Sequence, residues 1–123
     1  MRVLIVDDSP TMRRMIISSL HHIGFRDCVE ASDGEEALRA FDSSIGCVIT
    51  DWNMPNMSGL DFVRSLRAEH GSDVPIIMVT TRSVREDIVQ AARAGVTNYI
   101  VKPFTPQVLK DKLDQVLGMV EGA

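Results

Sequence analysis

The sequence predicts an α/β fold, a doubly wound parallel sheet of five strands with five alternating helices. Two observations carry this prediction. Short apolar runs alternate along the whole chain with longer segments whose apolar residues recur at helical spacing. The short runs are almost wholly apolar, which is typical of strands covered on both faces. Strands in such an alternation are parallel and are joined by right-handed helical crossovers.

The first strand and helix are the most clearly marked. Residues 3–6 form a continuous apolar run, after which Ser9 can cap a helix that has Pro10 in its first position. We expect this helix to end at Gly24. Its apolar face is made by Met12, Met15, Ile16, Ser19, Leu20 and Ile23.

The second repeat is weaker and the third strand is again strong. Residues 28–31 predict a strand, and Asp33 followed by Glu36 resembles a capping box. The helix after it turns Ala37, Leu38 and Phe41 inward. Residues 47–50 predict the third strand, and a loop over residues 51–57 follows.

The second half repeats the pattern. Residues 75–79 and 98–101 predict the last two strands. Ser58 and Thr105 are caps for the third and fifth helices, and Gly95 ends the fourth. The inner faces are Phe62, Val63 and Leu66 in the third helix, Val84, Ile88, Ala91 and Ala92 in the fourth, and Leu109, Leu113, Val116, Leu117 and Val120 in the fifth.

Length and composition exclude several classes of protein. The 123 residues predict a single domain, residues 1–123, without an output domain. Thirteen basic and seventeen acidic residues give a net charge of -4, which disfavours nucleic-acid binding. No apolar run approaches the about 18 residues of a membrane span. Cys28 and Cys47 lie in apolar runs and are expected to be reduced core residues, so we expect a cytoplasmic protein. We expect a monomer because no long apolar surface stripe is left unassigned.

Polar residues follow four of the predicted strands. They are Asp7 and Asp8, then Asp51, then Thr80 with Thr81, and finally Lys102. Ligands of an open parallel sheet bind at the carboxyl ends of its strands. The sequence therefore places three carboxylates, a hydroxyl and an ammonium at one edge.

This set predicts a phosphoryl site with a hard divalent cation. Carboxylates that crowd together repel one another, and oxygen ligands without His or Cys select Mg2+, with Mn2+ as a substitute. The lysine and the hydroxyl suit phosphate oxygens. No glycine-rich phosphate loop occurs, so the natural acceptor is an aspartate, which can form an acyl phosphate.

Each piece also has an ordinary structural interpretation. Paired aspartates after a strand are often a solvated loop or a helix cap, and a Lys-Pro pair is often a turn. The joint occurrence at successive strand ends favours the functional interpretation.

The motifs at these strand ends resemble response-regulator receiver domains. The resemblance rests on residues 6–9, 51–59, 79–81 and 101–104, and it spans nearly the whole chain. Within the family the chain is most similar to single-domain chemotaxis regulators. The resemblance implies the flavodoxin-like strand order 2-1-3-4-5.

The resemblance also implies roles for the site residues. Asp51 would be the phosphoacceptor and would bind Mg2+ together with Asp8 and the backbone carbonyl of Asn53, while Asp7 would act mostly through water. Lys102 would hold a phosphoryl oxygen, next to a cis bond to Pro103.

The resemblance implies that the domain has two conformations and that two further residues change position when Asp51 is phosphorylated. Thr80 would move to the phosphoryl group, and Tyr99 would swing from exposed to buried. The chain departs from the family where Thr81 replaces a smaller residue. Arg82 and Asn53 lie where the lifetime of the phosphorylated form is tuned.

The implied partners are a histidine kinase, a flagellar motor switch protein and a phosphatase. The alternatives within the same fold are a stand-alone phosphorelay carrier and a regulator of a non-motor partner. An aspartyl-phosphate phosphatase of the haloacid dehalogenase class needs Asp-x-Asp after the first strand, and here Ser9 follows Asp7 at that spacing. A purely structural domain would leave the four strand ends unexplained. We therefore expect a signalling module and not a turnover enzyme.

Overall fold

A computed structural model describes the backbone of residues 1–121 and the side chains of residues 1–118. Five strands and five helices alternate, in the order β1 (Arg2–Val6), α1 (Pro10–His22), β2 (Asp27–Ala31), α2 (Gly34–Ala40), β3 (Ile45–Thr50), α3 (Gly59–Ala68), β4 (Ile76–Thr80), α4 (Arg85–Ala94), β5 (Asn98–Val101) and α5 (Pro106–Glu121). All strand pairs are parallel and the sheet order is β2-β1-β3-β4-β5, which confirms the predicted fold. Within the described residues no helix is both long and apolar enough to span a bilayer.

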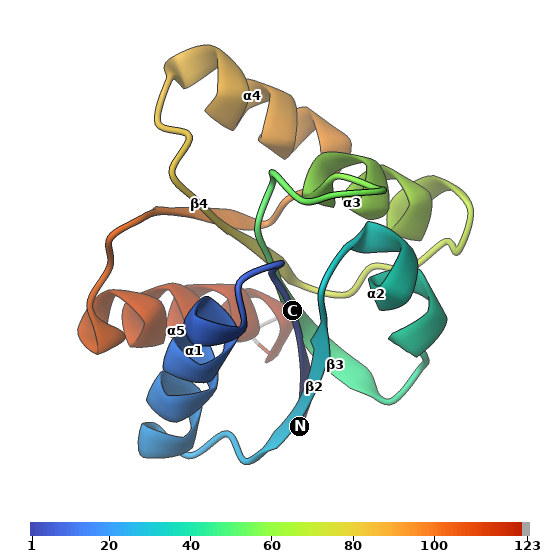
Figure 1. Cartoon of the computed structure of the whole chain (residues 1–123). Coiled ribbons are helices and arrows are strands. Elements are labelled where there is room, and N and C mark those ends of the chain that lie inside the picture. Colours follow the sequence, from blue (N-terminus) through green and yellow to red (C-terminus); the bar gives the residue numbers. More distant parts are fainter. Residues whose placement is uncertain (122–123) are drawn as a thin grey trace.

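The sheet separates two apolar clusters. Helices α1 and α5 cover one face, while α2, α3 and α4 cover the other (Figure 1). Alternate residues of β1 face opposite ways, so Val3 and Ile5 pack under α1 and α5 while Leu4 and Val6 pack under α2 and α3. Burial on both faces accounts for the continuous apolar runs in the strands.

The predicted capping residues are observed. The side chains of Ser9, Asp33, Ser58 and Thr105 accept hydrogen bonds from backbone N–H groups in the first turn of α1, α2, α3 and α5. The capping box at α2 is only half formed, because the Glu36 carboxylate accepts a hydrogen bond from the Ser32 hydroxyl instead. Gly95 ends α4 with φ 116°, in the left-handed region that favours glycine.

Strand boundaries differ from the predictions by one or two residues. The strands β1, β2 and β3 begin at Arg2, Asp27 and Ile45, ahead of the apolar runs. Their first residues join the sheet although Arg2 and Asp27 are polar, because strand pairing is made by backbone hydrogen bonds. β4 begins after Pro75, which has no N–H to donate.

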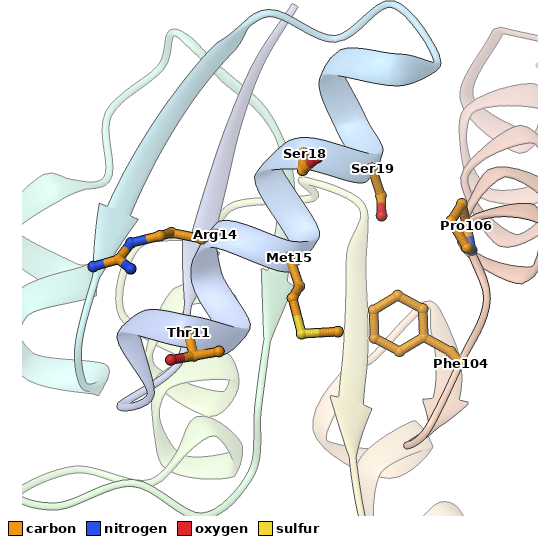
Figure 2. A pocket seen from close by; sticks show the side chains of 7 residues that line it. All are labelled: Thr11, Arg14, Met15, Ser18, Ser19, Phe104 and Pro106. Carbon is orange, nitrogen blue, oxygen red and sulfur yellow. The ribbon is translucent and has the colours of Figure 1, made fainter.

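Four residues predicted on inner helix faces are exposed: Met15, Val84, Ile88 and Ala92. Helix α4 buries only Ala91, because it flanks β5, the last strand, where the sheet offers less surface to cover it. Met15 lies about 100° around α1 from the buried Ile16 and so flanks the apolar stripe. It faces half-buried Phe104 across a groove between α1 and the loop before α5 (Figure 2).

The two cysteines are free, as predicted. Cys47 is buried, but Cys28 is only half-buried because β2 is an edge strand. The predicted inward position of Val120 lies outside the described side chains.

Candidate functional site

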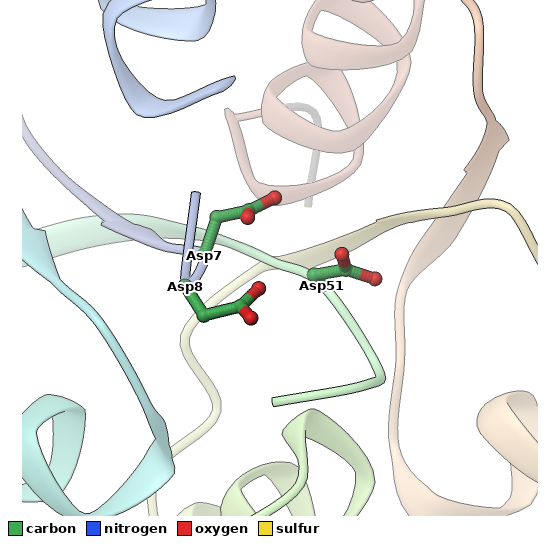
Figure 3. Close-up of side chains that lie close together, drawn as sticks. All are labelled: Asp7, Asp8 and Asp51. Carbon is green, nitrogen blue, oxygen red and sulfur yellow. The ribbon is translucent and has the colours of Figure 1, made fainter. Parts of the chain in front are cut away.

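The ends of β1 and β3 bring three carboxylates together. Asp7 and Asp8 follow β1, and Asp51 follows β3 (Figure 3). One carboxylate oxygen from each residue lies within 4.8 Å of the others. Asp7 is buried, Asp51 is half-buried and Asp8 is exposed, so the cluster opens toward solvent on the Asp8 side.

Strand register explains this convergence. β1 and β3 are adjacent, and Val6 lies opposite Thr50, so the next residue of each strand is an aspartate at the same level. The ladder continues through both acids, because Asp51 N–H donates to the Val6 carbonyl at 2.9 Å and Asp7 N–H donates to the Ala31 carbonyl at 3.1 Å. The backbone of Asp7 and Asp51 is therefore held by main-chain hydrogen bonds.

Lys102 reaches this cluster from the end of β5. Its Nζ lies 2.9 Å from Asp51 Oδ2 and 3.0 Å from Asp7 Oδ2. The Lys102 N–H donates to the Thr80 carbonyl at 2.8 Å, and the bond from Lys102 to Pro103 is cis, as the resemblance implied. The side chain is 13% exposed, so both ion pairs lie in a partly dehydrated site.

Burial and hydrogen bonding compete in setting the pKa values here. Burial raises the pKa of Asp7 above its ordinary value, although hydrogen bonds from Ser9 N–H and Lys102 lower it. Burial alone would lower the pKa of Lys102, but hydrogen bonds to Asp51 and Asp7 outweigh it and raise the pKa. Lys102 therefore stays protonated between the two carboxylates.

The donor set fits a hard divalent cation. Three carboxylates face one ammonium, so ionised side chains leave an excess of two negative charges. The available ligands are oxygens, and His or Cys does not join this cluster in the described part of the chain. The cluster can therefore hold a cation such as Mg2+.

The Asp51 carboxylate is oriented by two donors. Its Oδ1 accepts the Trp52 N–H at 2.6 Å, and its Oδ2 accepts Lys102. The Trp52 side chain is 6% exposed and belongs to the apolar core.

The residues predicted to form the switch lie beside the cluster. Thr80 is buried, and its Oγ1 accepts the Arg82 N–H at 3.4 Å, whereas Thr81 is exposed. Tyr99 is half-buried, and its hydroxyl donates to the Arg82 carbonyl at 2.9 Å. Burial raises the pKa of Tyr99, with a further contribution from Asp87.

Arg82 is the centre of a network with Trp52 and Asn53, the two residues that follow Asp51. Its guanidinium lies 4.5 Å from the centre of the Trp52 ring, and Nη2 and Nε donate to Asn53 Oδ1 at 2.9 and 3.2 Å. Nη1 also pairs with Asp87 at 3.4 Å. The side chain of exposed Asn53 is thus occupied by Arg82. Sequence reasoning grouped Asn53 with Arg82 but missed the stacking on Trp52, since no local pattern signals a contact across 30 positions.

Two other residues at the site were missed. Arg13 Nη1 donates to the Asp7 carbonyl at 2.6 Å, and Arg13 Nε pairs with Glu30 at 3.0 Å. A Cβ at Gly59 would overlap the Asp51 carbonyl oxygen and would lie 2.8 Å from the carbonyl carbon. Helical spacing places Arg13 beside the apolar face of α1, but only the packing of α1 on the sheet places it at a strand end.

Comparison with known proteins shows which proteins the chain resembles. The family model described as response regulator receiver domain matches residues 3–114. The chain is 51% identical over 121 residues to "Chemotaxis protein CheY1" of Helicobacter pylori, covering 96% of this chain and 98% of that protein. It is 52% identical over 125 residues to "Chemotaxis protein CheY homolog" of Campylobacter jejuni, covering 99% and 96%. The solved structure of the chemotaxis response regulator CheY4 of Vibrio cholerae is similar with TM-score 0.84 at 37% identity, covering 94% of this chain and 97% of that one.

Proposed function

Because the chain belongs to the response regulator receiver domain family, we propose that it is a phospho-accepting regulator of a two-component system. Asp51 takes a phosphoryl group from a histidine kinase, and the phosphorylated domain changes its affinity for a target protein. Residues 1–123 act as a single receiver domain. Its catalysis acts on itself, in phosphorylation and later hydrolysis.

The observation that carries this proposal is the setting of the Asp51 carboxylate. It stands at a strand end, is oriented by Trp52 N–H and Lys102, and adjoins Asp7 and Asp8. An Asp51 oxygen attacks the phosphorus of a phosphohistidine, the P–N bond breaks, and the imidazole nitrogen takes the electron pair. The product is an acyl phosphate. Lys102 stabilises the negative charge on the phosphoryl oxygens.

Asp8, Asp51 and the backbone carbonyl of Asn53 would hold Mg2+, with Asp7 acting mostly through water. When bound there, the cation would supply positive charge that offsets the carboxylates and the incoming phosphoryl oxygens. Mn2+ has similar ligand preferences and is the expected substitute.

The switch follows from new contacts that exist only with phosphate present. The Thr80 hydroxyl is adjacent to the site, and its hydrogen can be donated to a phosphoryl oxygen. Movement of Thr80 would alter the turn at Arg82, whose carbonyl now accepts the Tyr99 hydroxyl. Tyr99 would then move further inward.

The lifetime of the acyl phosphate depends on residues that neighbour Asp51. Arg82 and Asn53 form a hydrogen-bonded pair there, and Thr81 adds bulk at the exposed rim. We propose that these three residues control access of the phosphodonor and of attacking water.

The partners follow from the relatives, which are chemotaxis proteins by name. We expect a kinase of the chemotaxis type, a flagellar motor switch protein as target and a phosphatase, in the cytoplasm, with the domain itself a monomer. A phosphorelay carrier or a regulator of a non-motor protein would use the same Asp51 chemistry.

Phosphorylation tests the chemistry. With labelled acetyl phosphate and MgCl2, the domain should retain one equivalent of phosphate, and Asp51→Asn should retain none. Asp111→Asn, which changes an exposed carboxylate on α5, is the matched control and should behave like the unmodified domain. Labelling of Asp51→Asn equal to that of the control would refute the assignment. Release of many equivalents of phosphate from small phosphomonoesters would indicate a phosphatase instead.

Target binding separates the outputs. Beryllofluoride with Mg2+ mimics the phosphoryl group on Asp51, and it should tighten binding to the N-terminal peptide of the flagellar switch protein relative to Mg2+ alone. Equal binding in both states, with Trp52 fluorescence still responding to beryllofluoride, would retain the receiver chemistry and favour the phosphorelay or a non-motor target.

A further inference from the structure

Arg13 in α1 joins the ends of two strands beside the carboxylate cluster. Its Nη1 donates to the backbone carbonyl of Asp7 at 2.6 Å, and its Nε pairs with Glu30, in β2, at 3.0 Å. The Arg13 side chain is 16% exposed, so it is held rather than solvated. The adjacent Arg14 is exposed and forms no hydrogen bond or ion pair with the described side chains.

The carbonyl that Arg13 binds belongs to the peptide linking Asp7 to Asp8. The Asp7 carboxylate has donors of its own, because Ser9 N–H lies 2.9 Å from its Oδ1 and Lys102 Nζ lies 3.0 Å from its Oδ2. The Asp8 carboxylate has no hydrogen-bond donor among the described residues, and it is the exposed member of the cluster. Since no described donor holds this carboxylate, the place from which it can reach the cluster depends on the peptide from which it projects.

We propose that Arg13 is a positioning residue for cation binding, which it supports by fixing the Asp7–Asp8 peptide and so aiming the Asp8 carboxylate at the cluster. This inference rests on the proposed function, in which Asp8 binds Mg2+. Glu30 has two effects in this arrangement. It anchors the guanidinium at a second point, and its negative charge offsets the charge that Arg13 brings near a cation site.

The proposal predicts a change in cation affinity that is opposite in direction to the one expected from charge alone. A positive charge near a cation site opposes cation binding, so its removal should tighten binding. Loss of a residue that orients a ligand should weaken binding, since partners of metal ligands typically change affinity by about 10- to 100-fold. The two explanations of Arg13 thus predict opposite changes.

Titration of MgCl2 into the purified domain, followed by calorimetry and Trp52 fluorescence, tests the sign. Arg13→Met should bind Mg2+ about tenfold more weakly than the unmodified domain. Arg14→Met removes the same charge from the next position of α1 and should bind as the unmodified domain does, or slightly more tightly. Equal or tighter binding by Arg13→Met would overturn the proposal.

Two more variants separate positioning from general loss of structure. Arg13→Lys keeps the charge and one donor but loses the planar fork, so its affinity should fall between those of Arg13→Met and the unmodified domain. Glu30→Gln keeps the hydrogen bond from Arg13 to the Asp7 carbonyl but removes the ion pair that anchors Arg13. It should weaken Mg2+ binding less than Arg13→Met does. If Arg13→Met does not fold, these two variants still decide the question, because unchanged affinity in both would contradict the proposal.

A measurement without metal keeps this inference distinct from the proposed function. The 15N order parameter of the Asp8 amide should fall in Arg13→Met and stay unchanged in Arg14→Met. If the unmodified domain fails to bind MgCl2, the metal part of the proposed function is wrong, and the inference is overturned with it. An unchanged Asp8 order parameter in Arg13→Met, in a domain that does bind MgCl2, would overturn the inference alone.

Discussion

Replacement of Gly59 by alanine should strongly destabilise the domain and disturb Asp51. Gly59 is the first residue of α3, and its N–H donates to the Trp52 carbonyl at 2.8 Å. An added Cβ would overlap the Asp51 carbonyl oxygen and would lie 2.8 Å from its carbon and 3.1 Å from Thr50 Oγ1. The obstacle is backbone, so α3 has to retreat.

The magnitude follows from two losses. Overpacking against a backbone that cannot rotate away costs about 1–3 kcal/mol. Retreat of α3 also weakens the hydrogen bond to the Trp52 carbonyl, worth about 1 kcal/mol. We expect a loss of about 3 kcal/mol in the free energy of unfolding. At about 4 °C per kcal/mol for a domain of this size, Tm should fall by about 12 °C.

Thermal unfolding followed by circular dichroism measures this change. Gly118→Ala in α5 is the matched control, because a Cβ there meets nothing within 4 Å. That variant should be more stable by about 0.5–1 kcal/mol, since alanine is favoured over glycine within a helix. The steric reasoning would be refuted by a Gly59→Ala domain that unfolds within about 2 °C of the unmodified one.

Three further predictions concern one contact at the opposite edge of the sheet and two contacts at the site. Gly95→Ala should cost about 2 kcal/mol by urea unfolding, because Gly95 has φ 116° and a Cβ would lie 2.7 Å from Arg67 Cγ. Combined with Arg67→Met it should cost less than the sum, because Arg67 donates to the Gly95 carbonyl at 2.8 Å; full additivity would contradict this. Arg82→Ala should shift Trp52 emission and cost about 0.5–1 kcal/mol, and an unchanged emission spectrum would argue against the stacking. The pKa of Lys102 is raised above its ordinary value of 10.5 by its hydrogen bonds to Asp51 and Asp7. The ion pairs of Lys102 therefore stabilise the fold fully below pH 10.5, and this stabilisation is lost as the pH rises through the folded pKa. In urea unfolding over this alkaline range, the free energy of unfolding should fall less for Lys102→Met than for the unmodified domain.

The fold was predictable because its signals are local. The Ser9 cap, the apolar run of β1 and the glycine after α4 each depend on neighbouring residues. The exposure of Ile88 was not predictable in this way, because it depends on how far the sheet extends beneath α4. Sequence periodicity shows which face of a helix is apolar, and it does not show whether anything covers that face.

The candidate site likewise has residues that the sequence predicts and contacts that it does not. Asp7 and Asp51 could be placed together because parallel strands end at the same edge, and the structure brings them to one cluster with Lys102. The contacts of Arg82 with Trp52 and of Arg13 with Asp7 depend on side-chain directions and helix packing. Residue spacing alone carries no information about them.

The hydrogen-bond pattern divides the site into two parts. Asp7 and Asp51 form a firm half, and the segment with Thr81 and Arg82 forms a yielding half. Asp7 and Asp51 extend the ladder of the central strands, so displacing them means breaking main-chain bonds next to the core. Thr81 and Arg82 lie in the segment between β4 and α4, which is tied down by the Thr80, Asn53 and Tyr99 contacts of Arg82 and is largely exposed. Under the proposed function a phosphoryl group joins the firm half. A new hydrogen bond to the phosphoryl group therefore forms by movement of the yielding half toward it. Helix α4 can follow this movement at little cost, because Ala91 is its only buried residue.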